Sequence, residues 1–135
     1  MVERFSSGRP WEEKFKYSRA VMVGPLFQTC MTSPSDPAGG ILYPGDVAGQ
    51  TRRCLEIIGE TLSMAGLGFA DIVMSKIYLL DTGLWEEAGA VHAAMVGEAR
   101  PTLSFLGCAN FWHPDILVEV EVTAYDPRKA FPTAR

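Results

Sequence analysis

The chain has 135 residues, 47% of them hydrophobic, and its 12 basic and 16 acidic side chains give a formal net charge of −4. This size and apolar content suffice for one domain, residues 1–135, whose core needs no disulfide or metal ion. The acidic balance argues against nucleic-acid binding, because proteins with that role usually carry a basic stripe, and no stretch approaches the ~18 apolar residues of a membrane span.

In chain order, the first predicted elements are a β-hairpin and a long helix. Residues 20–23 and 26–32 are short apolar runs joined by the turn signal Gly24-Pro25. From about Asp46, apolar residues recur at steps of three and four until Gly66. This period predicts an amphipathic helix that Asp46 caps and Gly66 ends.

Three further elements and a loop follow. Residues 72–80 are rich in β-branched and aromatic side chains and predict a buried strand. An apolar stripe over residues 84–96 predicts a second helix, and residues 102–106 predict another strand. Residues 107–114 are expected to form an irregular loop.

The last predicted strand, residues 116–125, carries the most informative pattern. Apolar residues alternate strictly along it, so Glu119 and Glu121 project from one face while the other face is buried. Either this carboxylate face meets solvent, or it lines a pocket or a subunit interface in which one glutamate performs acid–base chemistry.

The element order β-β-α-β-α-β-β predicts a two-layer α+β domain, with one mixed sheet and two helices on one face. The opposite face of the sheet has no predicted cover within the chain. We therefore expect the protein to form an oligomer through that face.

The cysteines and histidines suggest neither disulfides nor metal binding. Cys30, Cys54 and Cys108 are odd in number and widely spaced, which fits a reducing, cytoplasmic location better than a disulfide framework. His92 and His113 are 21 positions apart on different predicted elements, without other ligands at metal-binding spacing, so we expect no metal site.

Several short motifs, taken in their order and spacing, resemble one protein family. They are Tyr17-Ser18-Arg19-Ala20-Val21, Gln50-Thr51-Arg52, Ala70-Asp71-Ile72-Val73 and Leu117-Val118-Glu119-Val120-Glu121. Together they resemble the Rid family of reactive-intermediate deaminases, also known as YjgF or L-PSP endoribonucleases, over about residues 6–127. The opening Ser7-Gly8-Arg9-Pro10-Trp11-Glu12 resembles a branch whose members begin Ser-Gly-x-Pro-Trp-Glu.

The resemblance implies a chorismate-mutase-like fold that assembles as a homotrimer, with three ligand pockets between subunits and no cofactor. It also implies hydrolysis of enamines and imines to ketones and ammonia. The family's pocket tyrosine corresponds to Tyr17, and its glutamate, thought to help activate water, corresponds to Glu119. A glycine of its second strand falls at Cys30, and an asparagine of its second helix falls at Gly89.

The family's signature arginine, which pairs with a substrate carboxylate, has no clear counterpart. Anchoring on Pro101 places Leu103 at that position, with Phe105 two residues further on. A competing alignment keeps Arg100 as this arginine, in extended backbone before the proline, and treats part of residues 108–115 as an insertion. A leucine cannot replace a bidentate guanidinium contact, so the first alignment disfavours small enamine acids and favours apolar or aromatic substrates.

The remaining candidates each have a functional and a structural interpretation. Trp112 is expected to join Leu103 and Phe105 in an apolar wall, and His113 to act as an acid–base partner or lid residue. His92 fits either a pocket contact or a half-buried helix histidine. Cys30 fits either a ligand contact or a small buried hydrophobe, and no histidine stands near it to make it a nucleophile.

The sequence thus favours an enzyme that hydrolyses, deaminates or tautomerises a small enamine, imine or similar reactive metabolite. Glu119 is then the general base or acid, and Tyr17 positions water or substrate. A binding trimer without catalytic activity is the alternative. RNA cleavage is third, because of the acidic net charge.

Overall fold

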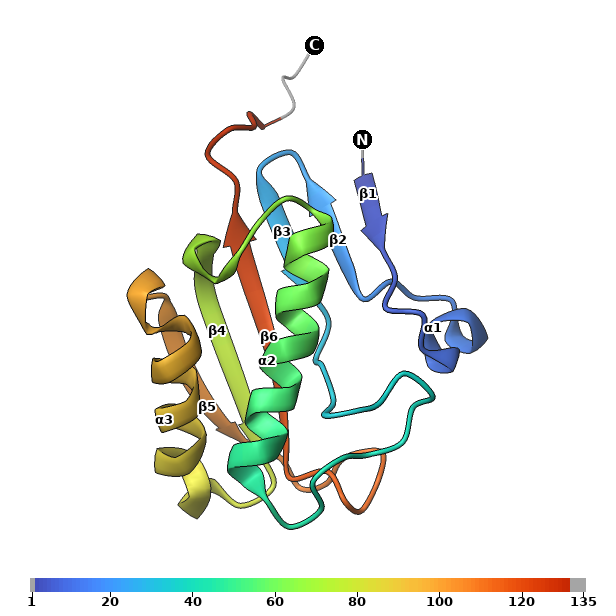
Figure 1. Cartoon of the computed structure of the whole chain (residues 1–135), viewed down its shortest axis with the longest axis vertical. Coiled ribbons are helices and arrows are strands. Elements are labelled where there is room, and N and C mark those ends of the chain that lie inside the picture. Colours follow the sequence, from blue (N-terminus) through green and yellow to red (C-terminus); the bar gives the residue numbers. More distant parts are fainter. Residues whose placement is uncertain (1, 132–135) are drawn as a thin grey trace.

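The computed structural model describes residues 2–131, and its core element is one six-stranded sheet (Figure 1). The spatial order of the strands is β1-β2-β3-β6-β4-β5. Strands β4 and β5 pair in parallel, while the other neighbours pair antiparallel, so the predicted mixed sheet is confirmed. The strands are β1 (Val2–Phe5), β2 (Ala20–Val23), β3 (Leu26–Thr29), β4 (Ile72–Leu79), β5 (Thr102–Gly107) and β6 (Val118–Tyr125).

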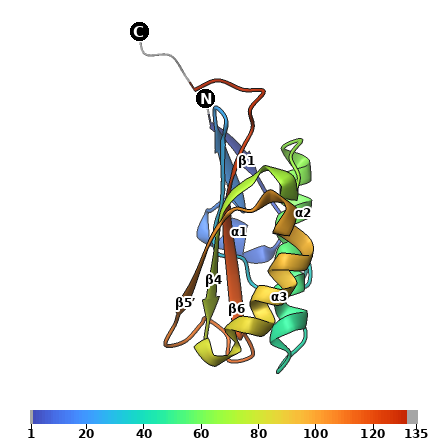
Figure 2. The same ribbon diagram turned by 90° about the vertical axis from the view of Figure 1, so that its left-hand side faces the viewer.

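Two long helices, α2 (Val47–Met64) and α3 (Trp85–Val96), cover the same face of this sheet (Figure 2). Their placement confirms the prediction of a two-layer α+β fold. The Asp46 side chain accepts a hydrogen bond from the Gly49 amide at 2.9 Å and caps α2. Gly66 follows the helix in the left-handed region, with φ of 75°, where a side chain is disfavoured.

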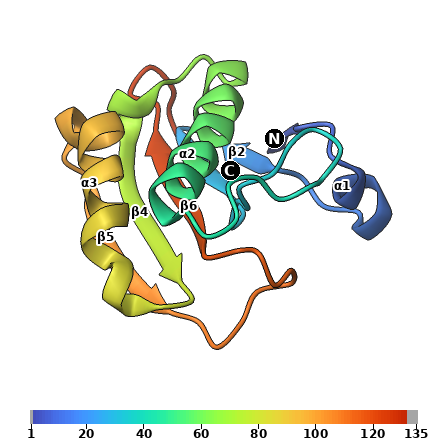
Figure 3. The same ribbon diagram turned by 60° about the horizontal axis from the view of Figure 1, so that its bottom comes forward.

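The sequence did not predict β1 or the short helix α1 (Pro10–Phe15). Strand β1 is an edge strand of four mostly exposed residues, so it has no buried alternation to detect. Helix α1 has six residues, which is under two turns and too short to show a helical period. Figure 3 shows α1 at the opposite end of the molecule from α3.

Strand β6 presents its two faces as the alternation predicts. Its buried face packs under α2 and α3 and consists of Val118, Val120, Val122 and Ala124. Glu119 and Glu121 therefore point to the face of the sheet opposite α2 and α3.

The segment between β3 and α2 extends this sheet irregularly. The Thr32 amide donates to the Val120 carbonyl at 2.7 Å, and the Val120 amide donates back to the Thr32 carbonyl at 3.2 Å. This pair of bonds fixes the next residue, Ser33, beside Glu119. None of the helices described between residues 2 and 131 is long and apolar enough to cross a membrane.

Candidate functional site

A cavity of about 570 Å³ lies between helix α1, the segment after β3 and the carboxylate face of β6. Four residues singled out from the sequence line it, namely Tyr17, Cys30, Trp112 and Glu119. The other lining residues are Arg9, Trp11, Phe15, Arg19, Met31, Ser33 and Ser35. The cavity thus combines aromatic rings with two arginines and one acidic side chain.

Glu119 is the only carboxylate among these lining residues, and just 5% of it is exposed. Its Oε2 atom accepts hydrogen bonds from the Ser33 hydroxyl and, at 3.2 Å, from the Trp112 indole N–H. Burial raises the pKa of Glu119, although these two bonds and the nearby Arg19 oppose the rise. A carboxylate with a raised pKa is a stronger base than a solvated one, which suits it to proton transfer.

Trp112 connects the loop before β6 to the N-terminal helix. Its indole N–H also reaches the Ser33 hydroxyl at 2.9 Å, and its ring meets the edge of Trp11 with centroids 5.7 Å apart. His113 stacks edge-on against Trp112, and its Nδ1 accepts the Asp115 amide at 3.1 Å. His113 therefore adjoins the cavity through Trp112 and is not among its lining residues.

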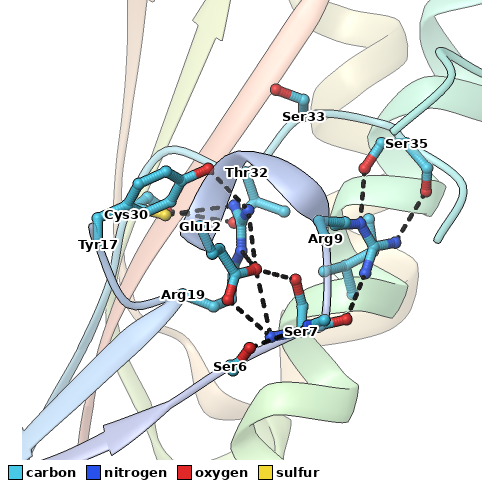
Figure 4. Close-up of polar contacts among 12 residues, drawn as sticks. Ser6, Ser7, Arg9, Glu12, Tyr17, Arg19, Cys30, Thr32, Ser33 and Ser35 are labelled. Atoms are coloured by element: carbon cyan, nitrogen blue, oxygen red, sulfur yellow. Dashed lines mark hydrogen bonds and ion pairs between the residues drawn. The ribbon is translucent and has the colours of Figure 1, made fainter. Parts of the chain in front are cut away.

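Tyr17 and Cys30 meet at the guanidinium of Arg19 (Figure 4). Arg19 donates to the Tyr17 hydroxyl at 3.4 Å and to the Cys30 sulfur at 3.2 Å. Burial raises the pKa of the Cys30 thiol despite the neighbouring cation, so the sulfur stays protonated at neutral pH. This environment fits a wall residue better than a nucleophile.

Arg19 also forms a buried ion pair with Glu12 of helix α1, with Nη2 and Oε2 3.4 Å apart. Glu12 accepts hydrogen bonds from the Ser7 amide, at 3.0 Å, and from the Ser7 hydroxyl. Burial raises the pKa of Glu12, but the bonds from Ser7 and the charge of Arg19 outweigh it and leave that pKa lowered. Glu12 is thus a permanent anion that joins α1 to the start of β2.

Arg9, at the start of α1, is 5% exposed and is held by neutral groups. It donates to the Ser35 hydroxyl at 2.8 Å, to the Ser35 carbonyl at 3.0 Å and to the Ser7 carbonyl at 3.4 Å (Figure 4). Burial, followed by the charges of Arg53 and Arg19, lowers the pKa of Arg9. An arginine nevertheless keeps its proton in proteins, so Arg9 remains a cation.

Four other predicted site residues lie on the helix side of the sheet and do not meet Glu119 within the chain. Leu103 and Phe105 pair with Ser75 and Ile77 of β4, whose side chains are buried under the helices. Phe105 fills the space beside Gly89, where an added Cβ would lie 3.2 Å from its ring. His92 is buried, and its Nε2 is 2.9 Å from the Ser75 hydroxyl.

Arg100 lies outside the cavity too. It is exposed, ends a 3₁₀ turn and has φ of 46° and ψ of 52°, so the expected extended backbone before Pro101 was wrong. It precedes the end of β5 that pairs with Met74, whereas Glu119 pairs with Tyr78 near the other end of β4. Within the chain, neither alignment brings a cation from β5 to Glu119.

Glu121 has a partner of its own, because the Tyr78 hydroxyl donates to its Oε1 atom. Burial and this carboxylate raise the pKa of Tyr78 to about 12. Glu121 is not among the cavity's lining residues. The two glutamates of β6 therefore have different surroundings, with Glu119 in the cavity and Glu121 on the open sheet.

The sequence interpretation overlooked Arg9, Arg19 and Ser33 as site residues. For Arg19 a signal existed, because Ala20 and Met22 face the core and the alternation places Arg19 on the side of Glu119. Arg9 and Ser33 lie in irregular segments, where no period applies. Among residues 2–131, no group of three or more histidine, cysteine or acidic side chains is placed to hold a metal ion.

Comparison with known proteins gives a consistent result. The family model described as "Endoribonuclease L-PSP" matches residues 10–126. The uncharacterized protein SCO2049 of Streptomyces coelicolor is 31% identical over 125 residues, covering 92% of each chain. The crystal structure of Rv2704 from Mycobacterium tuberculosis, described as a YjgF/YER057c/UK114 family member, is 38% identical with a TM-score of 0.83, covering 93% of this chain and 99% of that one. Escherichia coli TdcF, solved with bound serine, is 27% identical with a TM-score of 0.72 and covers 81% of this chain and 87% of its own.

Proposed function

Since the chain belongs to the endoribonuclease L-PSP family, also called YjgF/YER057c/UK114, we propose that the cavity at Glu119 is the active site of an imine or enamine hydrolase. The observation that carries this proposal is a buried carboxyl group of raised pKa at the wall of a cavity large enough for a small metabolite. A glutamate without a functional role is usually exposed to solvent, so its burial at a cavity wall favours a role in the reaction.

In this proposal Glu119 transfers protons in both halves of the reaction. Its carboxylate takes a proton from water as the water oxygen bonds to the imine carbon. The resulting carboxylic acid returns the proton to the nitrogen and gives a carbinolamine. The carboxylate then takes the proton of the carbinolamine hydroxyl and passes it to the nitrogen as the carbon–nitrogen bond breaks, so the products are a ketone and ammonia. A raised pKa serves the first step, because it makes the carboxylate a stronger base than that of a solvated glutamate.

The other lining residues support a small substrate with an aromatic or apolar body. Trp11, Phe15 and Trp112 supply ring surfaces, and the Tyr17 hydroxyl is available to orient water or substrate. TdcF, a family relative, was solved with bound serine. This supports a small molecule, rather than a polymer, as the ligand of the present cavity.

We further propose that the protein is a homotrimer in a reducing, cytoplasmic environment. The uncovered face of the sheet offers a surface for association between copies. Cys30, Cys54 and Cys108 are all free thiols, in keeping with such an environment.

The proposal is tested by ammonia release from imines generated in solution, with aromatic and small aliphatic examples in parallel. The wild-type protein should accelerate hydrolysis of at least the aromatic imine, and Glu119→Gln should abolish the acceleration. Circular dichroism checks that the variant is folded. Equal rates for both proteins would reject the assignment of Glu119.

The alternative is a binding protein without catalytic activity. The hydrogen bonds to Glu119 are the observation that most favours this alternative. Ser33 and Trp112 both donate to Oε2, which leaves fewer lone pairs for a reacting water. In that case aromatic ligands would raise the melting temperature, yet no imine would be hydrolysed faster than in buffer. RNA cleavage ranks third, since the net charge is −4.

A further inference from the structure

Trp112 is oriented with its polar edge inward, although it lies in a loop. A tryptophan usually buries its apolar ring and keeps its N–H at the wetter end of the side chain. Here the side chain is 51% exposed, whereas its N–H is directed at Glu119, which is 5% exposed. Trp11 and His113 each hold the ring edge-on, with centroids 5.7 Å away. These contacts fix the indole N–H beside the carboxyl group.

The indole N–H has two acceptors, and both belong to the surroundings of Glu119. It lies 2.9 Å from the Ser33 Oγ atom and 3.2 Å from Glu119 Oε2. An indole nitrogen can only donate, so Ser33 accepts from Trp112 with a lone pair and directs its single hydroxyl proton to Glu119 Oε2. The hydrogen bonds therefore run in one direction, from Trp112 through Ser33 to Glu119.

Both donors meet the same oxygen of Glu119. A carboxylate oxygen has two lone-pair sites, and those of Oε2 are filled by the Ser33 hydroxyl and the Trp112 N–H. No donor from residues 2–131 reaches Oε1. A proton on Oε2 would face two donor hydrogens, whereas a proton on Oε1 leaves both hydrogen bonds intact. The geometry therefore favours Oε1 as the protonated oxygen.

We propose that Trp112 is a positioning residue for Glu119, which it orients directly and through Ser33. The two donors fix Oε2 and leave Oε1 to take the proton from water and to return it. The indole is a neutral donor that cannot accept a proton, so it orients the carboxylate without neutralising its charge or competing for the proton. The role of Oε1 in hydrolysis rests on the proposed function, whereas the hydrogen bonding of Glu119 and the site of its proton do not.

Other ionisable groups near Glu119 do not take this role. Arg19, just before β2, attracts the carboxylate but makes no hydrogen bond to it within residues 2–131. Burial raises the pKa of the Cys30 and Cys54 thiols, so both stay protonated at neutral pH. His113 contacts the indole ring, and its titration must be separated from that of Glu119.

The first test uses intact wild-type protein, whose three tryptophans give three indole N–H resonances. NMR follows these resonances and the glutamate carboxyl carbons as the pH is varied, and Glu119→Gln assigns the carbon of Glu119. The Trp112 resonance should shift with the same midpoint as this carbon and lose that transition in Glu119→Gln. Any transition that persists in the variant belongs to His113. A Trp112 resonance that never follows Glu119 would overturn the proposal.

Hydrogen exchange in the same samples tests which oxygen holds the proton. Below the midpoint, the Trp112 N–H should still exchange more slowly than the N–H of Trp85, a half-exposed residue of α3, because a proton on Oε1 leaves the bonds of Trp112 intact. Loss of this protection on protonation would place the proton on Oε2 and contradict the proposal.

A matched pair of variants then measures what the donor contributes. Trp112→Phe keeps an aromatic ring and removes the N–H. Because that donor stabilises the charged form of Glu119, its loss should raise the midpoint of the carboxyl carbon by about one pH unit. Trp85→Phe should leave the midpoint in place. An unchanged midpoint in folded Trp112→Phe would overturn the proposal, and if this variant does not fold, the wild-type resonances decide.

These titrations involve no turnover, so the two proposals can fail separately. In imine hydrolysis, Trp112→Phe should lower kcat more than it raises KM, because a ring remains at the cavity wall while the base is less well oriented. Coupled titration of Trp112 and Glu119 without hydrolysis of any imine would overturn the hydrolase and leave the placement of the proton standing. Hydrolysis by a protein in which Trp112 titrates independently of Glu119 would do the reverse.

Discussion

The Ser33 hydroxyl donates to the Glu119 carboxylate, although the two residues are 86 positions apart in the chain. The contact exists because Thr32 and Val120 exchange backbone hydrogen bonds, which places the segment after β3 alongside β6. The protonation of Glu119 therefore depends on a loop that no alternation pattern marks. This relationship links the fold directly to the proposed chemistry.

Removing the Ser33 hydroxyl should raise the pKa of Glu119 further, since that bond stabilises the charged form. If the carboxylate acts as the base, Ser33→Ala should move the acidic limb of the kcat/KM profile to higher pH. A pH profile of imine hydrolysis measures this. Ser63→Ala, an exposed position on α2, serves as control and should leave the limb in place. A shift to lower pH in Ser33→Ala would contradict the assignment.

Breaking the buried Glu12–Arg19 pair should destabilise the protein by about 3 kcal/mol or more, because it leaves Arg19 buried without its anion. Urea unfolding of Glu12→Gln measures the loss. The adjacent Glu13 is the control, since it forms a largely exposed ion pair with Lys16, and Glu13→Gln should cost less than about 1 kcal/mol. Equal effects of the two substitutions would refute the structural role of Glu12.

His92 should prove structural, because it lies buried on the helix side of the sheet against Ser75. His92→Ala should lower the free energy of unfolding by about 2–4 kcal/mol through the lost packing and hydrogen bond. Any folded fraction should hydrolyse imines at the wild-type rate per active molecule. If His92→Ala left the free energy of unfolding unchanged and abolished imine hydrolysis, His92 would instead be a residue of the active site.

Placing an arginine at Leu103 should not create an anion site in the single chain. Leu103 packs against the core on the face opposite Glu119, so Leu103→Arg should destabilise the protein by about 2–4 kcal/mol. Ala94→Arg is the control, because Ala94 is exposed on α3 and should tolerate the change. Chemical denaturation of both variants gives the comparison. A stable Leu103→Arg protein with a gain in carboxylate affinity would contradict this placement.

The sequence predicted those parts of the fold that repeat with a period. Apolar residues recur with the helical period along α2 and at every second position along β6. The buried faces of both elements and the orientation of Glu119 could therefore be derived from the sequence alone. Helix α1 and the segment holding Ser33 are short or irregular and are positioned by tertiary contacts. Those are the parts that carry Arg9 and complete the cavity, so the site was predicted less well than the fold.

The predicted apolar wall of the pocket illustrates why the site was predicted less well than the fold. Phe105 and Trp112 were expected to stand together, but residue type alone does not give the face of a strand. The register of β5 on β4 turns Phe105 toward Gly89 and the helices. Trp112, in an irregular loop, reaches Glu119 instead.

The central claim is that Glu119, and not its neighbour Glu121, transfers the proton. The direct measurement is kcat/KM for hydrolysis of an aromatic imine by Glu119→Gln and by Glu121→Gln, both verified as folded and of wild-type oligomeric state. Glu119→Gln should lower kcat/KM by about 100-fold or more, the usual worth of a general acid–base group, and Glu121→Gln by only a few-fold. Wild-type kcat/KM in Glu119→Gln would contradict the account.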